Sequence, residues 1–338
     1  MTLQDSHISL AHGNGGRFMR ELIDEVFARH LASDTLDTTA DAVRLSLPGE
    51  EILFTTDGFT VQPLEFPGGS IGSLAVHGTT NDLAVAGADP LYLSLNAFIE
   101  EGFDVAQLER IVADLGRAAS EIGVSVAAGD TKVLPRGQGG GIYLATTGIG
   151  VLRHPTPLGM KQIRDGDAIL VSGPIGDHGI SVMLAREQFG LRGDIISDAA
   201  SVLDITRAMR EVPGIRFMRD PTRGGLVSVA HEIARATGLT VALDEPTIPV
   251  RPAVRTVCDM LGYDPYYLAC EGRVVAVVDP GSAQDALSAM RRQSGGELAE
   301  VIGCVRQQSG EACVSLKTEV GGLRFLQELE DDPLPRIC

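Results

Sequence analysis

The sequence has few aromatic residues, few lysines and no tryptophan. Aromatic residues make up 4% of the 338 residues, and Lys occurs only at positions 132, 161 and 317. Acidic residues number 45 against 28 basic ones, which gives a formal net charge of −17. Such a chain repels a phosphate backbone and offers little aromatic surface on which unpaired bases could stack. We therefore expect no nucleic-acid partner.

Long apolar runs and paired cysteines are also missing. No segment reaches the roughly 18 apolar residues that span a bilayer, and no basic region followed by an apolar stretch begins the chain. We therefore expect a cytoplasmic protein with no membrane partner. An odd number of cysteines without a C-x-x-C pair indicates free thiols rather than disulfides or a zinc site. These cysteines are Cys258, Cys270, Cys304, Cys313 and Cys338.

The pattern of apolar residues predicts two domains of mixed helices and strands. In the first half it predicts helices over 71–86 and 105–122, and strands over 51–56, 91–98, 124–128 and 142–151. In the second half it predicts helices over 180–189, 199–212, 225–237 and 283–292, and strands over 168–172, 240–243, 274–278, 299–305 and 312–316. A Pro-bearing stretch at 154–159 separates the halves. We place an N-terminal domain at 1–155, a C-terminal α/β domain at 156–328 and a tail at 329–338.

Four aspartates stand at the end of apolar runs or beside glycine. They are Asp57, Asp82, Asp130 and Asp220. A single Asp in such a place is more often a turn or cap residue, but four of them favour magnesium, which commonly bridges carboxylates to substrate phosphates. The sequence contains neither a Walker nor a Rossmann motif.

Two glycine-rich segments could bind phosphate. Gly13, Asn14, Gly15 and Gly16 precede a helical pattern over 18–27, and their backbone N–H groups could surround a polyphosphate at a helix N-terminus. Arg223 and Gly224 precede the predicted helix at 225–237 in the same way. An ordinary glycine-rich turn explains the first segment equally well.

Three residues could act directly on a substrate. Lys132 follows Asp130-Thr131 and could supply a compact cation for a phosphate or a polarised oxygen, although it could also be a surface lysine. Glu271 precedes an apolar strand, where partial burial would raise its pKa; an exposed Glu at a strand edge is the alternative. Cys338 ends a segment stiffened by Pro333 and Pro335, and its thiol could be acylated and carried between sites unless it is a chance terminal residue.

Seven motifs, taken together, resemble the HypE family of hydrogenase maturation proteins. They are the segments 11–17 (AHGNGGR), 63–69 (PLEFPGG), 77–82 (HGTTND), 129–133 (GDTKV), 176–179 (GDHG), 220–225 (DPTRGG) and 335–338 (PRIC). The terminal Pro-Arg-Ile-Cys distinguishes this family from relatives of the same fold, such as aminoimidazole ribonucleotide synthetase and thiamine-monophosphate kinase. One departure is Gly58, where the resemblance leads us to expect Ser.

The resemblance implies a two-domain α/β (α+β) fold of the aminoimidazole ribonucleotide synthetase type. In this fold the N-terminal sheets of two subunits pair in a homodimer, and ATP binds near their interface. The resemblance also implies a reaction. A carbamoyl group delivered to Cys338 by the carbamoyltransferase HypF is dehydrated with ATP to a thiocyanate, and the cyanide passes to iron on the HypC–HypD complex during [NiFe]-hydrogenase maturation.

That reaction gives each candidate residue a role. Mg²⁺ would be bound by Asp57, Asp82, Asp130 and Asp220, and ATP by Gly13, Asn14, Gly15, Gly16, Asn81, Thr131, Arg223 and Gly224. Lys132 would lie near the carbamoyl oxygen, Glu271 would take the nitrogen protons, and Cys338 would carry the group. Two other functions remain open: a small-molecule kinase or synthetase of the same fold, and a non-enzymatic thiol carrier.

Overall fold

The computed structural model describes residues 16–22, 24, 39, 43–47, 50–152, 158–186, 190 and 193–330. Gly13, Asn14, Gly15 and the residues from 331 to Cys338 lie outside this part of the chain. Within it, no helix is both long enough and apolar enough to span a membrane. Cys258, Cys270, Cys304 and Cys313 are free thiols, which confirms the prediction for these four.

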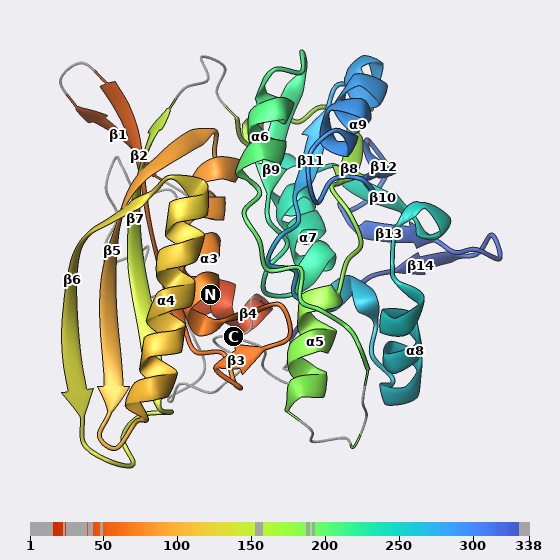
Figure 1. The fold of residues 1–338 in the computed structure, drawn as a ribbon. Coiled ribbons are helices and arrows are strands. Elements are labelled where there is room, and N and C mark those ends of the chain that lie inside the picture. Colours follow the sequence, from red (N-terminus) through yellow and green to blue (C-terminus); the bar gives the residue numbers. More distant parts are fainter. Residues whose placement is uncertain are drawn as a thin grey trace.

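The first half forms a five-stranded sheet with two helices on one face (Figure 1). The strand order is β1 (Val43–Leu47), β2 (Glu50–Phe59), β7 (Ile142–Leu152), β5 (Ala88–Glu100) and β6 (Ser125–Leu134). The helices are α3 (Ile71–Val85) and α4 (Val105–Ile122), and the short strands β3 (Glu65–Phe66) and β4 (Gly69–Ser70) precede them. A short helix, α1 (Arg17–Leu22), precedes the sheet in the chain.

No described helix or strand covers the opposite face of this sheet. Phe54, Tyr92 and Phe98 lie on it with 38%, 51% and 37% of their surface exposed. Residues between them along β5, such as Leu93 and Leu95, pack instead against the helices. The sheet therefore presents large apolar side chains on its open face.

The second half forms a seven-stranded sheet, coloured green to blue in Figure 1. Its order is β14 (Leu323–Phe325), β13 (Val314–Lys317), β10 (Thr240–Asp244), β12 (Glu300–Arg306), β8 (Ala168–Val171), β11 (Val275–Val278) and β9 (Ile215–Arg219). Helix α7 (Gly225–Thr237) packs on one face, and α6 (Leu203–Arg210) and α9 (Ala283–Arg291) on the other. A separate cluster joins α5 (Asp177–Ala185) to α8 (Pro252–Leu261).

Helix α3 joins the two halves. Only Ser73 and Asp82 of its 15 residues are not buried, because one side packs on β2, β5 and β7 while Ala84 and Val85 enter the core around α6 and α9. A capping box between Ser70 and Ser73 fixes its first turn. Residues of α3 therefore face both domains at once.

The two-domain α/β arrangement is confirmed, as are the helices predicted at 71–86, 105–122 and 225–237. Two strand predictions were wrong in extent. Asp57 lies inside β2 and Asp130 inside β6, not at strand ends, because pairing with β7 and β5 continues through them. The helix predicted from 199 begins only at Leu203, and the sequence patterns missed α8 and β9.

Candidate active site

Acidic side chains from both halves meet in one pocket. It is lined by Asp57, Gly58, Phe59, Gly78, Asp82, Asp220, Thr222, Arg223 and Glu271. We call it the carboxylate pocket. A single site is thus lined by three predicted magnesium ligands, one predicted nucleotide ligand and the predicted base. These residues are separated by up to 214 positions in the sequence.

Strand β2 and helix α3 supply two of the carboxylates. A Cβ on Gly78 would lie 2.8 Å from the Phe59 ring and 3.6 Å from Asp57 Oδ2, so α3 approaches β2 this closely only with glycine there. Asp82, one turn along α3, accepts a hydrogen bond of 3.0 Å from Thr55 Oγ1. Sequence reasoning missed Gly78, although it stands inside the 77–82 motif.

The loop between β9 and α7 supplies Asp220 and Arg223. Its glycines are required: Gly225 has a φ of +61°, and a Cβ there would lie 2.6 Å from the Leu268 carbonyl oxygen. The Pro221 carbonyl accepts a 3.0 Å hydrogen bond from the Cys270 amide, which brings the Glu271 segment against this loop. Asp220 and Glu271 are 5% and 4% exposed.

Burial dominates the electrostatics of the pocket. It raises the pKa of Asp57, raises that of Asp220 to about 6, and raises that of Glu271 well above its ordinary value. Negative charge on Asp220 and Asp57 raises the Glu271 pKa further, whereas Arg223 lowers the pKa of both Glu271 and Asp57. Carboxylates in this arrangement gain stability from a bound cation or a proton.

The carboxylate pocket is not a preformed metal cage. Within the described residues, no group of three His, Cys, Asp or Glu side chains is placed to hold a metal ion. Magnesium usually binds one or two carboxylates and fills its remaining positions with water and substrate phosphates. The raised pKa values of Asp57 and Asp220 fit such a cation, which would arrive together with a phosphate group.

Lys132 does not line this pocket, and Asp130 and Thr131 are on the same strand as Lys132. All three lie on β6, where they pair with Phe98, Asn96 and Ala97 of β5. Lys132 is exposed on the same face of the sheet as Phe98, and β7 and β5 separate its strand from β2. Within one chain, the structure therefore separates the predicted cation from the predicted base.

Asn81 binds protein rather than facing the pocket. Its Nδ2 donates to the carbonyl oxygens of Ala200 (3.0 Å) and Glu271 (3.2 Å), and its Oδ1 accepts from the Val202 amide (3.0 Å). The residue is 1% exposed. These bonds connect α3 to the Glu271 segment and to residues 200–202, and the contact of Asn81 with nucleotide stays a prediction.

Gly16 and Gly224 lie at the start of the C-terminal tail. The Arg17 amide donates to the Leu329 carbonyl at 2.8 Å, and a Cβ on Gly16 would lie 2.0 Å from that oxygen. A Cβ on Gly224 would be 3.6 Å from Leu329 Cδ1. The last described residues therefore lie next to the loop that carries Arg223.

The departure at Gly58 leaves the site intact. The Gly58 amide donates to Asp57 Oδ1 at 2.7 Å, and no atom lies within 4 Å of the position that a Cβ would take. The serine expected from the resemblance would fit here.

The fold and the site define the class of protein. Residues 39–152 match the N-terminal domain of AIR synthase related proteins, and residues 164–314 match the C-terminal domain of the same family. This chain thus contains both domains, and both contribute residues to the carboxylate pocket.

Closer relatives identify the family within this class. Carbamoyl dehydratase HypE of Azotobacter vinelandii is 44% identical over 339 residues, which cover 100% of this chain and 99% of that protein. A solved HypE–HypF complex superimposes with a TM-score of 0.86 at 41% identity, covering 91% of this chain and 99% of that one. A HypE structure in complex with ATP has a TM-score of 0.82 at 42% identity, with coverage of 98% and 100%. The chain belongs to the HypE family of carbamoyl dehydratases.

Proposed function

We propose that the carboxylate pocket uses ATP and Mg²⁺ to dehydrate an S-carbamoyl group on Cys338 to a thiocyanate. The observation that carries this proposal is the meeting of Asp57, Asp82, Asp220 and Glu271 with Arg223 in one pocket beside the start of the tail. Family membership supports the reaction class, and the ATP complex of a relative supports the nucleotide.

The chemistry requires three kinds of group. The amide oxygen is a poor leaving group until ATP phosphorylates it. Loss of that oxygen as phosphate, together with both nitrogen protons, converts S–C(=O)–NH₂ into S–C≡N and leaves ADP and inorganic phosphate. The site therefore needs carboxylates for Mg²⁺, a cation for the oxygen and a base for the nitrogen.

The described residues supply two of these groups. Asp57, Asp82 and Asp220 would hold Mg²⁺, which when bound neutralises charge on the phosphates. Glu271 is buried, and its raised pKa makes its carboxylate a stronger base for a nitrogen proton. Asp130, on β6, stays a prediction as a fourth ligand.

The tail is long enough for this role. Eight residues follow Glu330, from Asp331 to Cys338. At about 3.1 Å per residue in an extended Pro-rich conformation, they reach about 25 Å. The start of the tail lies beside Gly224, next to Arg223 in the carboxylate pocket, so Cys338 can come within reach of the phosphoryl donor.

Lys132 can take part in the proposed reaction only if a second copy of the chain brings it to a carboxylate pocket. We infer a homodimer in which the open faces of two N-terminal sheets pair, because Phe54, Tyr92 and Phe98 would otherwise remain in water. Lys132, on that face, would then serve the pocket of the other subunit. A mixture of Lys132→Ala and Glu271→Gln chains tests this idea: mixed dimers contain one pocket with both residues only if Lys132 acts across the interface, so activity should reappear on mixing.

The partners follow from the group transfers. HypF would supply the carbamoyl group, as the solved complex of relatives supports, and the HypC–HypD complex would accept the cyanide. These transfers would take place in the cytoplasm.

Intact-mass measurement of the C-terminal peptide tests the proposal. After incubation with HypF, carbamoyl phosphate and ATP, the wild-type peptide should carry a cyano group on Cys338, and Glu271→Gln should accumulate the carbamoyl group. Cys338→Ala should carry neither adduct while still binding ATP. ATP turnover that continues undiminished in Cys338→Ala would instead support a small-molecule kinase.

A further inference from the structure

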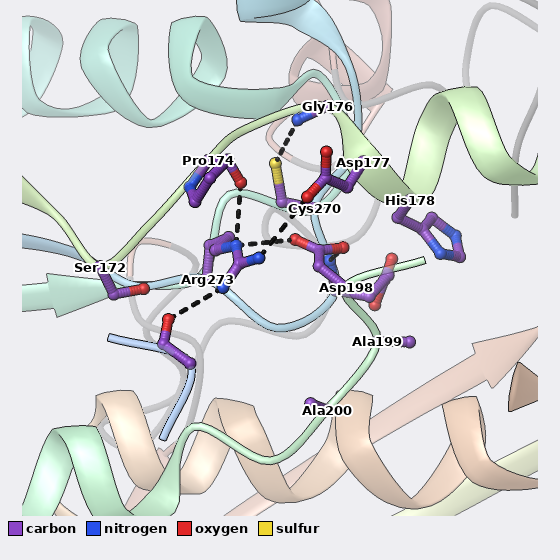
Figure 2. Close-up of polar contacts among 12 residues, drawn as sticks. Ser172, Pro174, Gly176, Asp177, His178, Asp198, Ala199, Ala200, Cys270 and Arg273 are labelled. Atoms are coloured by element: carbon purple, nitrogen blue, oxygen red, sulfur yellow. Dashed lines mark hydrogen bonds and ion pairs between the residues drawn. The ribbon is translucent and has the colours of Figure 1, made fainter. Parts of the chain in front are cut away.

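A buried ionic network, drawn in Figure 2, contacts the Glu271 backbone through Asp198. It consists of Arg273 between the carboxylates of Asp177 and Asp198, which we call the Arg273 network. All three residues are buried, and none of them lines the carboxylate pocket. The function proposed above gives them no role.

Backbone carbonyl groups fix the position of Arg273. Its Nε donates to the Pro174 carbonyl at 2.9 Å, and its Nη1 donates to the Gly295 carbonyl at 3.0 Å. The same guanidinium lies 3.2 Å from Asp198 Oδ2 and 3.7 Å from Asp177 Oδ2. The Asp198 carboxylate therefore forms an ion pair with a cation that two backbone carbonyl groups hold in place.

Asp198 connects this network to Glu271. Its other oxygen, Oδ1, accepts a hydrogen bond of 3.1 Å from the Glu271 amide, and its side chain is fully buried. A Cβ on Gly272 would lie 1.9 Å from the Asp198 carbonyl oxygen, so the two segments are in direct contact. The position of the Glu271 backbone therefore depends on Asp198.

Two neutral contacts hold the same segment from other sides. Asn81 Nδ2 donates to the Glu271 carbonyl, and the Cys270 amide donates to the Pro221 carbonyl. The Glu271 peptide is thus held by α3, by the Asp220 loop and by Asp198. Asp198 adds a charged acceptor, which makes the stronger kind of hydrogen bond.

We propose that Asp198, oriented by Arg273, is a positioning residue that holds Glu271 at the reacting group. This inference rests on the proposed function, in which Glu271 takes the nitrogen protons. Asp198 touches neither ATP nor the carbamoyl group in this scheme. It acts through the Glu271 backbone, and a displacement of about 1 Å at a reacting group can reduce the rate about 100-fold.

Single-turnover dehydration of the carbamoylated chain tests the inference. Asp198→Ala removes the acceptor and should slow cyanation about 100-fold, with loading by HypF and the KM for ATP unchanged. Asp198→Asn keeps an oxygen acceptor and should recover most of the rate. Arg251→Ala is the matched control. Among the described residues, the half-exposed Arg251 binds Asp177 at 2.8 Å rather than Asp198 or Glu271, so its loss should leave the rate unchanged.

A double variant separates positioning from a general structural effect. If Asp198 acts through Glu271, Asp198→Ala should add little slowing to Glu271→Gln. Equal slowing in both backgrounds would overturn the inference. If Asp198→Ala does not fold, Asp198→Glu replaces it, because it keeps the charge but moves the acceptor by one methylene. A normal rate in the folded variant would also overturn the inference.

The same set of variants distinguishes the two proposals. If Glu271→Gln forms the cyano product normally, the proposed role of Glu271 is wrong. If Glu271→Gln stalls while folded Asp198→Ala or Asp198→Glu reacts normally, only the positioning role of Asp198 is wrong.

Discussion

Replacing Gly272 by alanine should slow the dehydration strongly while leaving the protein folded. The added Cβ would lie 1.9 Å from the Asp198 carbonyl oxygen and 3.0 Å from the Ala200 amide nitrogen. Real Cβ atoms essentially never approach other heavy atoms closer than 3.0 Å. The Glu271–Gly272 segment or residues 198–200 must therefore shift by about 1 Å, since both contacting atoms belong to the backbone.

The expected magnitudes follow from that shift. Overpacking of this kind costs about 1–3 kcal/mol, less than the roughly 5–15 kcal/mol that stabilises a typical domain, so the chain should still fold. A displacement of about 1 Å at Glu271 should lower the dehydration rate about 100-fold. The φ of Gly272 does not lie in the left-handed region, so the effect arises from crowding alone.

Rate and stability should be measured on the same preparation. Single-turnover formation of the cyano product gives the rate, and urea unfolding gives the free energy of unfolding. Gly116→Ala is the matched control: Gly116 lies inside α4 with no atom within 4 Å of a Cβ, so alanine should add about 0.5–1 kcal/mol of stability and leave the rate unchanged. A Gly272→Ala chain that reacts at the wild-type rate would refute the reasoning.

Three further results are expected. Asp82→Asn should weaken ATP binding in the presence of Mg²⁺ by about tenfold or more, because it removes an anionic ligand. The amide oxygen can still accept the hydrogen bond from Thr55. Unchanged ATP affinity by calorimetry would make Asp82 a structural residue. Burial raises the pKa of Asp198 to about 6, so its ionisation destabilises the folded state as pH rises from about 4 through 6. The free energy of unfolding of Asp198→Asn, measured with urea, should accordingly increase relative to that of the wild type from pH 4 to pH 7. A difference that does not change with pH would contradict the raised pKa of Asp198. Gly225→Ala should destabilise the chain by more than about 1 kcal/mol in the same assay, since its φ is +61° and the Leu268 carbonyl lies 2.6 Å from the new Cβ; wild-type stability would be inconsistent with this geometry.

Local patterns in the sequence were enough to predict several elements. The helix at 105–122 follows from apolar spacing, an Asp104 cap and Gly123 at its end, all of which act within a few residues. The helix at 225–237 begins and ends at glycines in the same way. Strand extent was less predictable, because Asp57 and Asp130 continue their strands only through pairing with β7 and β5.

The sequence by itself also determined which residues are the candidates for chemistry. Asp82, Asp220 and Arg223 stand in motifs, Asp57 ends an apolar run beside glycine, and Glu271 precedes an apolar strand. Only the tertiary structure decided that these five share one pocket while Lys132 lies on the other face of the sheet. Asp198 and Arg273 belong to no recognisable motif, and their contact with Glu271 depends on how the segment at 193–202 packs between the two halves. Residue type and spacing record local preferences, whereas contacts between segments more than a hundred residues apart depend on how whole sheets and helices pack.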